Sequence, residues 1–156
     1  MKLTLLVVGK TTDPHIVALI DDYRKRLTHY LPFDLQVIPE LKNAKSLTQD
    51  QQKAQEGDLI LKTVGPTAFV VLLDEHGREY RSIEFADYLQ KRMSAGQDMF
   101  FVVGGPYGFS PEVYSRANGK ISLSQMTFSH QMVRLFFVEQ IYRAMTILRG
   151  EPYHHE

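Results

Sequence analysis

The sequence predicts a single α/β domain with a mostly parallel β-sheet and helices on both of its faces. Apolar runs that are typical of buried strands alternate about five times with segments of helical spacing, the pattern of strand–helix–strand units. The chain has 156 residues, the size of one ordinary domain. Because no composition shift or internal repeat divides it, we expect residues 1–156 to form one domain.

The predicted strands are short apolar or alternating segments bounded by Gly or Pro. Two continuous apolar runs, Ala68–Leu73 and Met99–Val103, have the pattern of strands that are buried on both faces. After the first of these we expect a turn at Glu75–Arg78. The remaining strands are predicted at Lys2–Gly9, at Phe33–Val37 before Pro39, and at Ile121 to Leu123.

The predicted helices begin at capping residues and end near glycines. The first is capped by Thr12 or Asp13, has Pro14 in its first turn, and repeats apolar residues at helical spacing. Its apolar positions are Ile16, Leu19, Tyr23, Leu27 and Tyr30. The other helices are predicted at Ser46–Val64, from the cap Ser82 to Gly96, from Ser110 to about Ala117, and from Ser129 to about Arg149.

The last predicted helix is apolar over more than one stripe. A helix that packs on one face needs only a narrower apolar band, so we expect this one to be covered on two sides. One side would pack on its own sheet, and a second subunit is the economical cover for the other. A central position within one domain is the alternative.

Composition excludes several classes of protein. Lys and Arg total 18 and Asp and Glu also total 18, which argues against a nonspecific nucleic-acid coat protein but leaves room for a local basic patch. The chain has no Cys, so disulfides and thiolate metal sites are excluded. The apolar runs are far shorter than a membrane span, and the first lacks the features of a signal peptide. We therefore expect a soluble cytoplasmic protein without a membrane partner.

Three predicted strand ends are candidates for a ligand site, because ligands of open α/β sheets lie beyond the carboxyl ends of the strands. These ends are Leu73-Asp74, Gly104–Gly108 and Leu123–Phe128. The glycine segment is neither a dinucleotide fingerprint nor a P-loop, and glycine at a strand end is more often a simple turn. Main-chain groups of the third segment would lack strand partners and could bind an adenine ring, although an ordinary loop explains them too.

The C-terminal residues Pro152–Glu156 include a tyrosine and two histidines. Such a tail could be catalytic, or it could be a frayed end. Neither histidine has a second ligand at helical spacing, so we do not expect a metal site.

Taken together, five motifs resemble one known family. They are Gly104-Gly105-Pro106-x-Gly108, Leu123-Ser124-x-Met126-Thr127, His130-x-x-x-Arg134, Glu139-Gln140-x-Tyr142-Arg143-Ala144 and Pro152-Tyr153-His154. This string resembles the bacterial large-subunit ribosomal RNA methyltransferase H family of the SPOUT class, and the resemblance covers essentially the whole chain. The sequence departs from relatives at Tyr107, where some carry Glu, and at His155, a position often held by Arg or Lys.

The resemblance implies a fold, an activity and an assembly. The fold has a trefoil knot near the C-terminus, which periodicity could not have revealed and which the usual rule against threaded loops would exclude. The activity is transfer of a methyl group from S-adenosylmethionine to N3 of a pseudouridine in a hairpin loop of 23S ribosomal RNA, on the assembled ribosome. The assembly is a homodimer with cofactor bound at the knot.

The resemblance also implies which residues form the site. The cofactor would lie against Leu73, Gly104, Gly105, Leu123, Ser124, Gln125, Met126, Thr127 and Phe128. The candidates for the chemistry are Arg143, Tyr153 and His154.

The chemistry assigns a possible role to each of these three. A sulfonium is already a good leaving centre, so no metal is needed and positioning should dominate. The N3 proton must leave, which calls for a base or for a cation that stabilises the imide anion. His154 is the candidate base, Arg143 the cation for the anion or a phosphate, and Tyr153 a stacking or orienting group.

Two readings from other classes stay open. The first is a nucleotide-binding regulator or ribosome-associated module on the same fold without chemistry, against which the Arg143 and Tyr153-His154 set argues. The second is a flavodoxin-like electron carrier, for which Gly9-Lys10-Thr11-Thr12 is a poor phosphate-binding loop.

Overall fold

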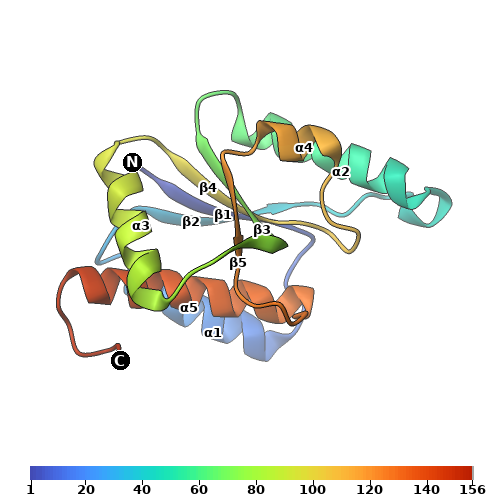
Figure 1. The fold of residues 1–156 in the computed structure, drawn as a ribbon. Helices are drawn as coiled ribbons and strands as arrows, with labels where there is room; N and C mark the ends of the chain where they lie inside the picture. The colour runs from blue at the N-terminus through green and yellow to red at the C-terminus, as the bar shows by residue number, and fades with distance from the viewer. Residues whose placement is uncertain (156) are drawn as a thin grey trace.

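The computed structural model describes residues 1–155, and in that part of the chain five parallel strands form one sheet in the order β2-β1-β4-β3-β5 (Figure 1). Strand β1 pairs with β2 and β4, and β3 pairs with β4 and β5, all in parallel. The predicted α/β class with a mostly parallel sheet is therefore confirmed. The strands are β1 (Leu3–Val8), β2 (Phe33–Ile38), β3 (Phe69–Glu79), β4 (Met99–Val103) and β5 (Gly119–Ser122).

Helices cover both faces of the sheet, as predicted. Figure 1 shows α1, α3 and α5 on one side and α2 with α4 on the other. Each side has its own buried apolar cluster, one around Phe101 and Phe137 and the other around Leu72 and Val102. The helices are α1 (Pro14–Leu27), α2 (Gln49–Val64), α3 (Ser82–Ser94), α4 (Pro111–Arg116) and α5 (His130–Leu148), with a 3₁₀ turn at Ala44–Ser46.

The predicted turn at Glu75–Arg78 is wrong, because β3 continues through it to Glu79. Ile121 of β5 is paired first with Leu73 and again with Arg78, so the intervening residues bulge out of the ladder. Gly77 makes this possible, since a Cβ there would lie 2.7 Å from the backbone of Ile121. A glycine that indicated a turn in the sequence instead permits two strand segments to share one partner.

Smaller differences concern the ends of elements. Thr48 and Gln51 form a capping box, so α2 starts at Gln49 instead of Ser46. Arg81 is the N-cap of α3, and the predicted cap Ser82 is its first helical residue. The last strand ends at Ser122, which leaves Leu123 in the loop that follows.

The first helix also buries a narrower face than its spacing indicates. Leu19 is 47% exposed, and Tyr30 lies beyond the end of α1 at Leu27. The helix therefore turns Ile16 and Ile20 toward the core, together with Leu27.

Helix α5 lies between α1 and α3, and these neighbours bury most of the apolar surface that exceeds one stripe. The alternative of a central helix within one domain thus explains much of its composition. Met132 and Phe136 remain 36% and 40% exposed, and Phe136 packs beside Phe128 at 5.6 Å between ring centroids. This small apolar face is what a second subunit could cover.

The predicted trefoil knot concerns how the chain threads through the region around β5. The double pairing of Ile121 and the place of β5 beside β3 are the observed features of this region. Within residues 1–155, no helix is both long enough and apolar enough to cross a membrane.

Candidate active site

A cavity of about 570 Å³ opens at the carboxyl edge of β3, β4 and β5. Three segments line it, namely Leu73–His76, Val103–Phe109 and Ile121–Phe128 without Gln125. Tyr114 of α4 and two residues from the first turn of α5 complete the lining. Its size is within the usual range of small-molecule sites. The three strand ends singled out in the sequence thus meet around one hollow, as the rule for parallel sheets requires.

Eight of the nine residues predicted to bind the cofactor line this cavity. They are Leu73, Gly104, Gly105, Leu123, Ser124, Met126, Thr127 and Phe128. The ninth, Gln125, belongs to the same loop but not to the lining. Ser124 orders this loop, because its hydroxyl accepts from the Met126 amide at 3.0 Å while its carbonyl accepts from the Ser122 hydroxyl at 2.9 Å.

The paired glycines serve the packing behind the cavity. A Cβ on Gly104 would lie 3.1 Å from the ring of Phe109, and one on Gly105 would lie 2.4 Å from Oε1 of Glu56. A side chain at Gly105 would therefore collide with α2 before it met a ligand. The two glycines let the loop settle onto these buried groups and leave its backbone facing the cavity.

Glu56 is a buried acid that sequence reasoning missed. Only 5% of the residue is exposed, and its Oε2 accepts from Gln52 at 3.1 Å. Burial raises the pKa of its carboxyl above the ordinary value. No local pattern singles out this acid, because Glu56 lies near the middle of α2 between Gln55 and Gly57.

Two acids stand at the mouth of the cavity. Asp74 accepts a hydrogen bond from the hydroxyl of Tyr114, and Glu75 follows it in the bulge of β3. Burial, and then the bond to Asp74, raise the pKa of Tyr114 to about 12, so this hydroxyl keeps its proton at neutral pH. Among the described residues that line the cavity there is no Lys or Arg, so its electrostatic character favours a ligand with positive charge.

Arg134, which ends the motif His130-x-x-x-Arg134, is buried, with 2% of its surface exposed. Its guanidinium donates to the carbonyls of Val8 and Gly9 at 2.8 and 2.9 Å, and to the hydroxyl of Thr11 at 3.0 Å. Burial lowers its pKa below the ordinary value for arginine. Arg134 thus joins the start of α5 to the loop that follows β1.

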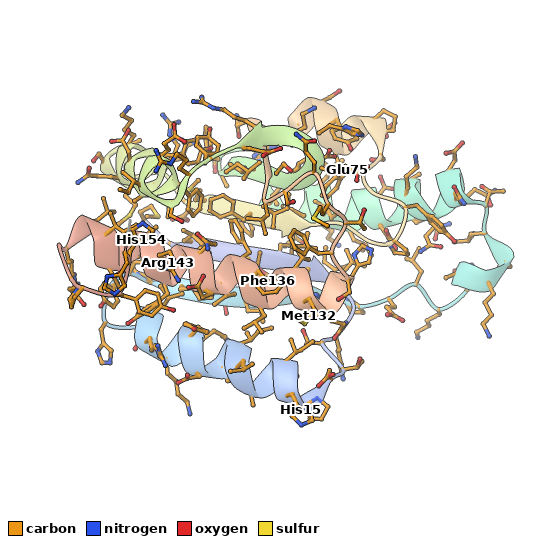
Figure 2. All side chains as sticks on the ribbon, turned by 60° about the horizontal axis from the view of Figure 1, so that its bottom comes forward. His15, Glu75, Met132, Phe136, Arg143 and His154 are labelled. Atoms are coloured by element: carbon orange, nitrogen blue, oxygen red, sulfur yellow. The ribbon has the colours of Figure 1, made fainter. Side chains whose placement is uncertain are left out.

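The three residues predicted for the chemistry lie elsewhere. Figure 2 shows Arg143 and His154 near one end of α5 and Met132 near the other. Because an α-helix rises about 1.5 Å per residue, His130 at the cavity and Arg143 are roughly 20 Å apart along α5. Within one chain the two halves of the predicted site are therefore separate.

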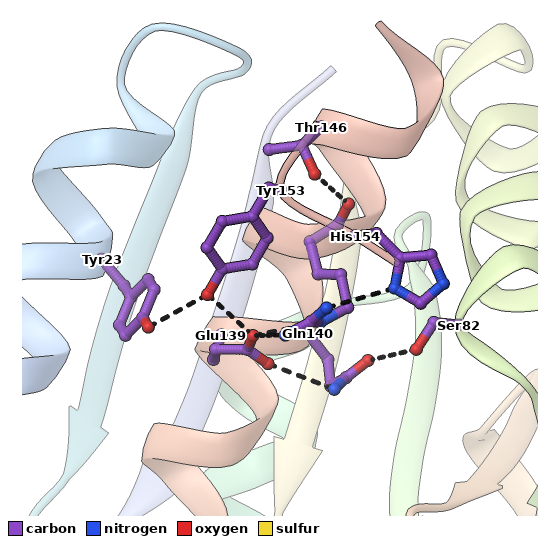
Figure 3. Close-up of polar contacts among 8 residues, drawn as sticks. Tyr23, Ser82, Glu139, Gln140, Thr146, Tyr153 and His154 are labelled. Atoms are coloured by element: carbon purple, nitrogen blue, oxygen red, sulfur yellow. Dashed lines mark hydrogen bonds and ion pairs between the residues drawn. The ribbon is translucent and has the colours of Figure 1, made fainter. Parts of the chain in front are cut away.

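These three residues do contact one another (Figure 3). Nη1 of Arg143 lies 3.1 Å from Nδ1 of His154, and the guanidinium lies over the ring of Tyr153 at 4.8 Å from its centroid. Tyr153 and His154 thus place the tail against α5, where it contacts Glu139 and Arg143.

Glu139 organises this group and was not singled out in the sequence beyond its place in a motif. Its Oε1 accepts from Nε and Nη2 of Arg143 at 3.1 and 2.7 Å and from the Tyr153 hydroxyl at 2.9 Å. Since Tyr153 donates to this carboxylate, it accepts from the hydroxyl of Tyr23 at 3.2 Å. Burial, followed by these two hydrogen bonds, raises the pKa of Tyr153, which holds it neutral.

The comparisons with known proteins agree with this architecture. Residues 1–154 match the family model described as "Predicted SPOUT methyltransferase". The chain belongs to the SPOUT methyltransferase family. Within it, a protein of Bacteroides thetaiotaomicron named "Ribosomal RNA large subunit methyltransferase H" is 62% identical over 157 residues, covering 100% of both chains. A protein of Flavobacterium psychrophilum with the same name is 55% identical, again over 100% of both chains. Its relatives therefore place this SPOUT methyltransferase in the large-subunit methyltransferase H family, as the motifs predicted.

Solved structures resemble this SPOUT methyltransferase in fold. A probable methylase family protein from Haemophilus influenzae matches with a TM-score of 0.59 at 10% identity, over 99% of this chain and 70% of the other. The tRNA (m1G37) methyltransferase from Aquifex aeolicus matches with a TM-score of 0.56 at 16% identity, over 100% of this chain and 76% of the other. In the described residues of this SPOUT methyltransferase, no group of three or more His, Cys, Asp or Glu is placed to hold a metal ion.

Proposed function

We propose that the protein transfers a methyl group from S-adenosylmethionine to N3 of a pseudouridine in a hairpin loop of 23S ribosomal RNA, on the assembled ribosome in the cytoplasm. The observation that carries this proposal is the convergence of the predicted cofactor segments on one cavity at the sheet edge. The full-length identity to proteins named "Ribosomal RNA large subunit methyltransferase H" supports ribosomal RNA as the substrate.

The residues of the cavity fit this cofactor. Apolar side chains at its floor, Leu73, Val103 and Ile121, suit the adenine ring, while the main chain of Leu123–Phe128 offers donors and acceptors to its edge. Asp74 and Glu75 suit a ligand with positive charge. When bound, S-adenosylmethionine would supply a methyl group on a positively charged sulfur.

A flavin phosphate fits the same cavity poorly. Its charge would meet Asp74 and Glu75, and no Lys or Arg among the described lining residues would balance it. The flavodoxin-like alternative therefore loses its support, and a titration with flavin mononucleotide beside S-adenosylmethionine compares the two ligands directly.

The substrate assignment has a direct test. Ribosomes that lack the modification should accept labelled methyl groups from S-adenosylmethionine, whereas ribosomes that already carry it should not. Naked 23S RNA should react far more slowly, since the enzyme would recognise the shape that several RNA elements form on the ribosome and would not depend on strong electrostatic attraction. Equal labelling of naked RNA would contradict the ribosomal context, and absence of labelling on all substrates would contradict the activity.

We further propose a homodimer, because Arg143, Tyr153 and His154 lie far from the cavity of their own chain. A partner could bring these residues to the cavity by covering the exposed face around Met132 and Phe136. Sedimentation should find a dimer at micromolar concentration. Phe136→Glu, which places a charge in this face, should shift the protein toward a monomer, while the matched change Leu59→Glu on the distant helix α2 should not. A wild-type monomer with full activity would contradict the dimer.

A further inference from the structure

A second hollow, of about 410 Å³, lies where the C-terminal ends of α1 and α5 meet, and it shares no residue with the cofactor cavity. All of its lining residues are basic or tyrosine, namely Lys25, Arg26, His29, Tyr30, Tyr142 and Arg149. Because the chain as a whole has no net charge, this gathering of bases differs from the average surface of the molecule.

Aromatic rings hold two of the cations in place. The guanidinium of Arg149 lies over the ring of Tyr30, 4.2 Å from its centroid, and its Nη2 donates to the carbonyl of His29 at 2.8 Å. The guanidinium of Arg26 lies 5.5 Å from the ring centroid of Tyr142. These contacts restrict the two flat cations before any ligand arrives, so that less side-chain entropy is lost when an anion binds.

Part of this positive charge has no acid to balance it. Arg26 pairs with Asp22 at 3.0 Å. By contrast, neither Lys25 nor Arg149 has a carboxylate within 4.0 Å among residues 1–155, and both are exposed. The carboxylate of Glu151 accepts a hydrogen bond from one of the lining tyrosines at 2.7 Å. An anion that enters the hollow therefore meets two accessible cations.

The ends of the helices explain some of these bases separately. Lys25 and Arg26 lie in the last turn of α1, and Arg149 is the C-cap of α5, positions where a cation offsets the helix dipole. Lys62 has the same place in the last turn of α2 but is not part of the hollow. The helix dipole does not explain why bases from two helices meet around tyrosines.

Tyr142 connects the hollow to the tail. Its ring packs edge-on against Tyr30, at 5.8 Å between centroids, and against Tyr153 at 4.8 Å. The guanidinium of Arg143 lies over the ring of Tyr153 in turn. The hollow is thus the direct neighbour of the residues that we expect to meet the target nucleotide, so an RNA strand that reaches them would also pass over the hollow.

We propose that Lys25, Arg26 and Arg149 form an RNA-backbone contact that binds phosphates flanking the target pseudouridine. This inference rests on the proposed function, in which the substrate is ribosomal RNA. A guanidinium matches the geometry of a phosphate, and lysine adds a compact charge beside it. Contacts of this kind do not read sequence but set the register and orientation of the protein on the RNA.

Removal of the charges tests the contact. In Lys25→Gln/Arg149→Gln, ribosome binding should weaken roughly tenfold or more, and the slope of log K against log salt should decrease in magnitude by about one to two. Arg149→Lys, which keeps the charge, should bind more tightly than Arg149→Gln. Lys62→Gln is the matched control for Lys25→Gln, because it removes an exposed charge from the same place in another helix, and it should bind like wild type. Weaker binding with an unchanged salt slope, or equal weakening by Lys62→Gln, would overturn the proposal.

A crosslink identifies the partner. Since the chain has no Cys, His29→Cys places a single thiol in the lining of the hollow, to which a photoreactive group can be attached. Irradiation of its ribosome complex should join this position to 23S RNA, and a crosslink to ribosomal protein alone would overturn the proposal. If wild type methylates ribosomes but the charge variants bind them equally well, the RNA-backbone contact is wrong and the proposed function stands. A wild type that neither binds nor methylates ribosomes would contradict both.

Discussion

At the scale of single residues, the buried carboxyl of Glu56 should lower the free energy of unfolding when it is charged. Burial disfavours its charged form, so its pKa in the folded protein lies above the ordinary value of 4.5. The native state then binds more protons than the unfolded state, and stability falls as pH rises from the unfolded pKa through the folded one. This cost is absent in acid and present in full at higher pH.

Glu56→Gln keeps the shape of the side chain and removes this titration. We expect the variant to be more stable than wild type at neutral pH by about 1 kcal/mol. The difference should shrink as the pH falls through the ordinary range of glutamate. Urea unfolding of both proteins at several pH values measures it, with the exposed Asp58→Asn in the same helix as control. A difference that is constant with pH would show that the carboxyl is not charged at a cost in the folded state.

The residue scale also shows what the sequence could and could not reveal about the site. Strand ends and motifs were sufficient to gather Leu73, Gly104 and the 123–128 loop around one cavity. Glu56 and Glu139 were not identified as site residues from the sequence, because their roles depend on burial and on partners that the fold brings together. The collision that a Cβ on Gly105 would have with Glu56 likewise depends on α2 packing behind the loop, which no local pattern encodes.

At the scale of elements, hydrophobic spacing predicted the order and type of every strand and long helix. It failed where tertiary pairing decided the outcome, as at Glu75–Arg78, where Gly77 lets β3 continue past β5. The observed ends of helices differ from the predicted ends by a few residues because of capping, as at Thr48. The apolar excess of α5 had two causes, its place between α1 and α3 and its exposed Phe136, and composition could not separate them.

Arg134 couples two elements, and its removal should be costly. Arg134→Met keeps the apolar stem but leaves the carbonyls of Val8 and Gly9 without this donor, so we expect a loss of about 2–4 kcal/mol in the free energy of unfolding. Gln131→Ala removes two exposed contacts to the same loop, to the amide of Thr12 and to the carbonyl of Lys10, and should cost about 1 kcal/mol or less. Urea unfolding compares the two, and similar small losses would mean that Arg134 does not secure the loop after β1.

At the scale of the whole molecule, the distance along α5 is the central constraint. The cavity is at the carboxyl edge of the sheet, while the Glu139–Arg143–His154 group is near the other end of the helix. Both are ordered in one chain, so a large rearrangement of the tail would break the contacts to Glu139 and Tyr23. The proposed assembly of two chains would bring the halves together without that loss.

A dimer with shared sites makes a prediction that a site within one chain does not. Thr127→Trp fills the cavity from an exposed loop position, and His154→Ala disables the tail, so each homodimer should be inactive. A heterodimer of the two variants would combine an open cavity on one chain with an intact tail on the other. If the tail serves the partner's cavity, the purified heterodimer has one working site of two and should show about half of wild-type methylation. If the tail serves its own chain, every site is defective and the heterodimer stays inactive. Cofactor titration of the same samples checks that Thr127→Trp blocks binding and His154→Ala does not.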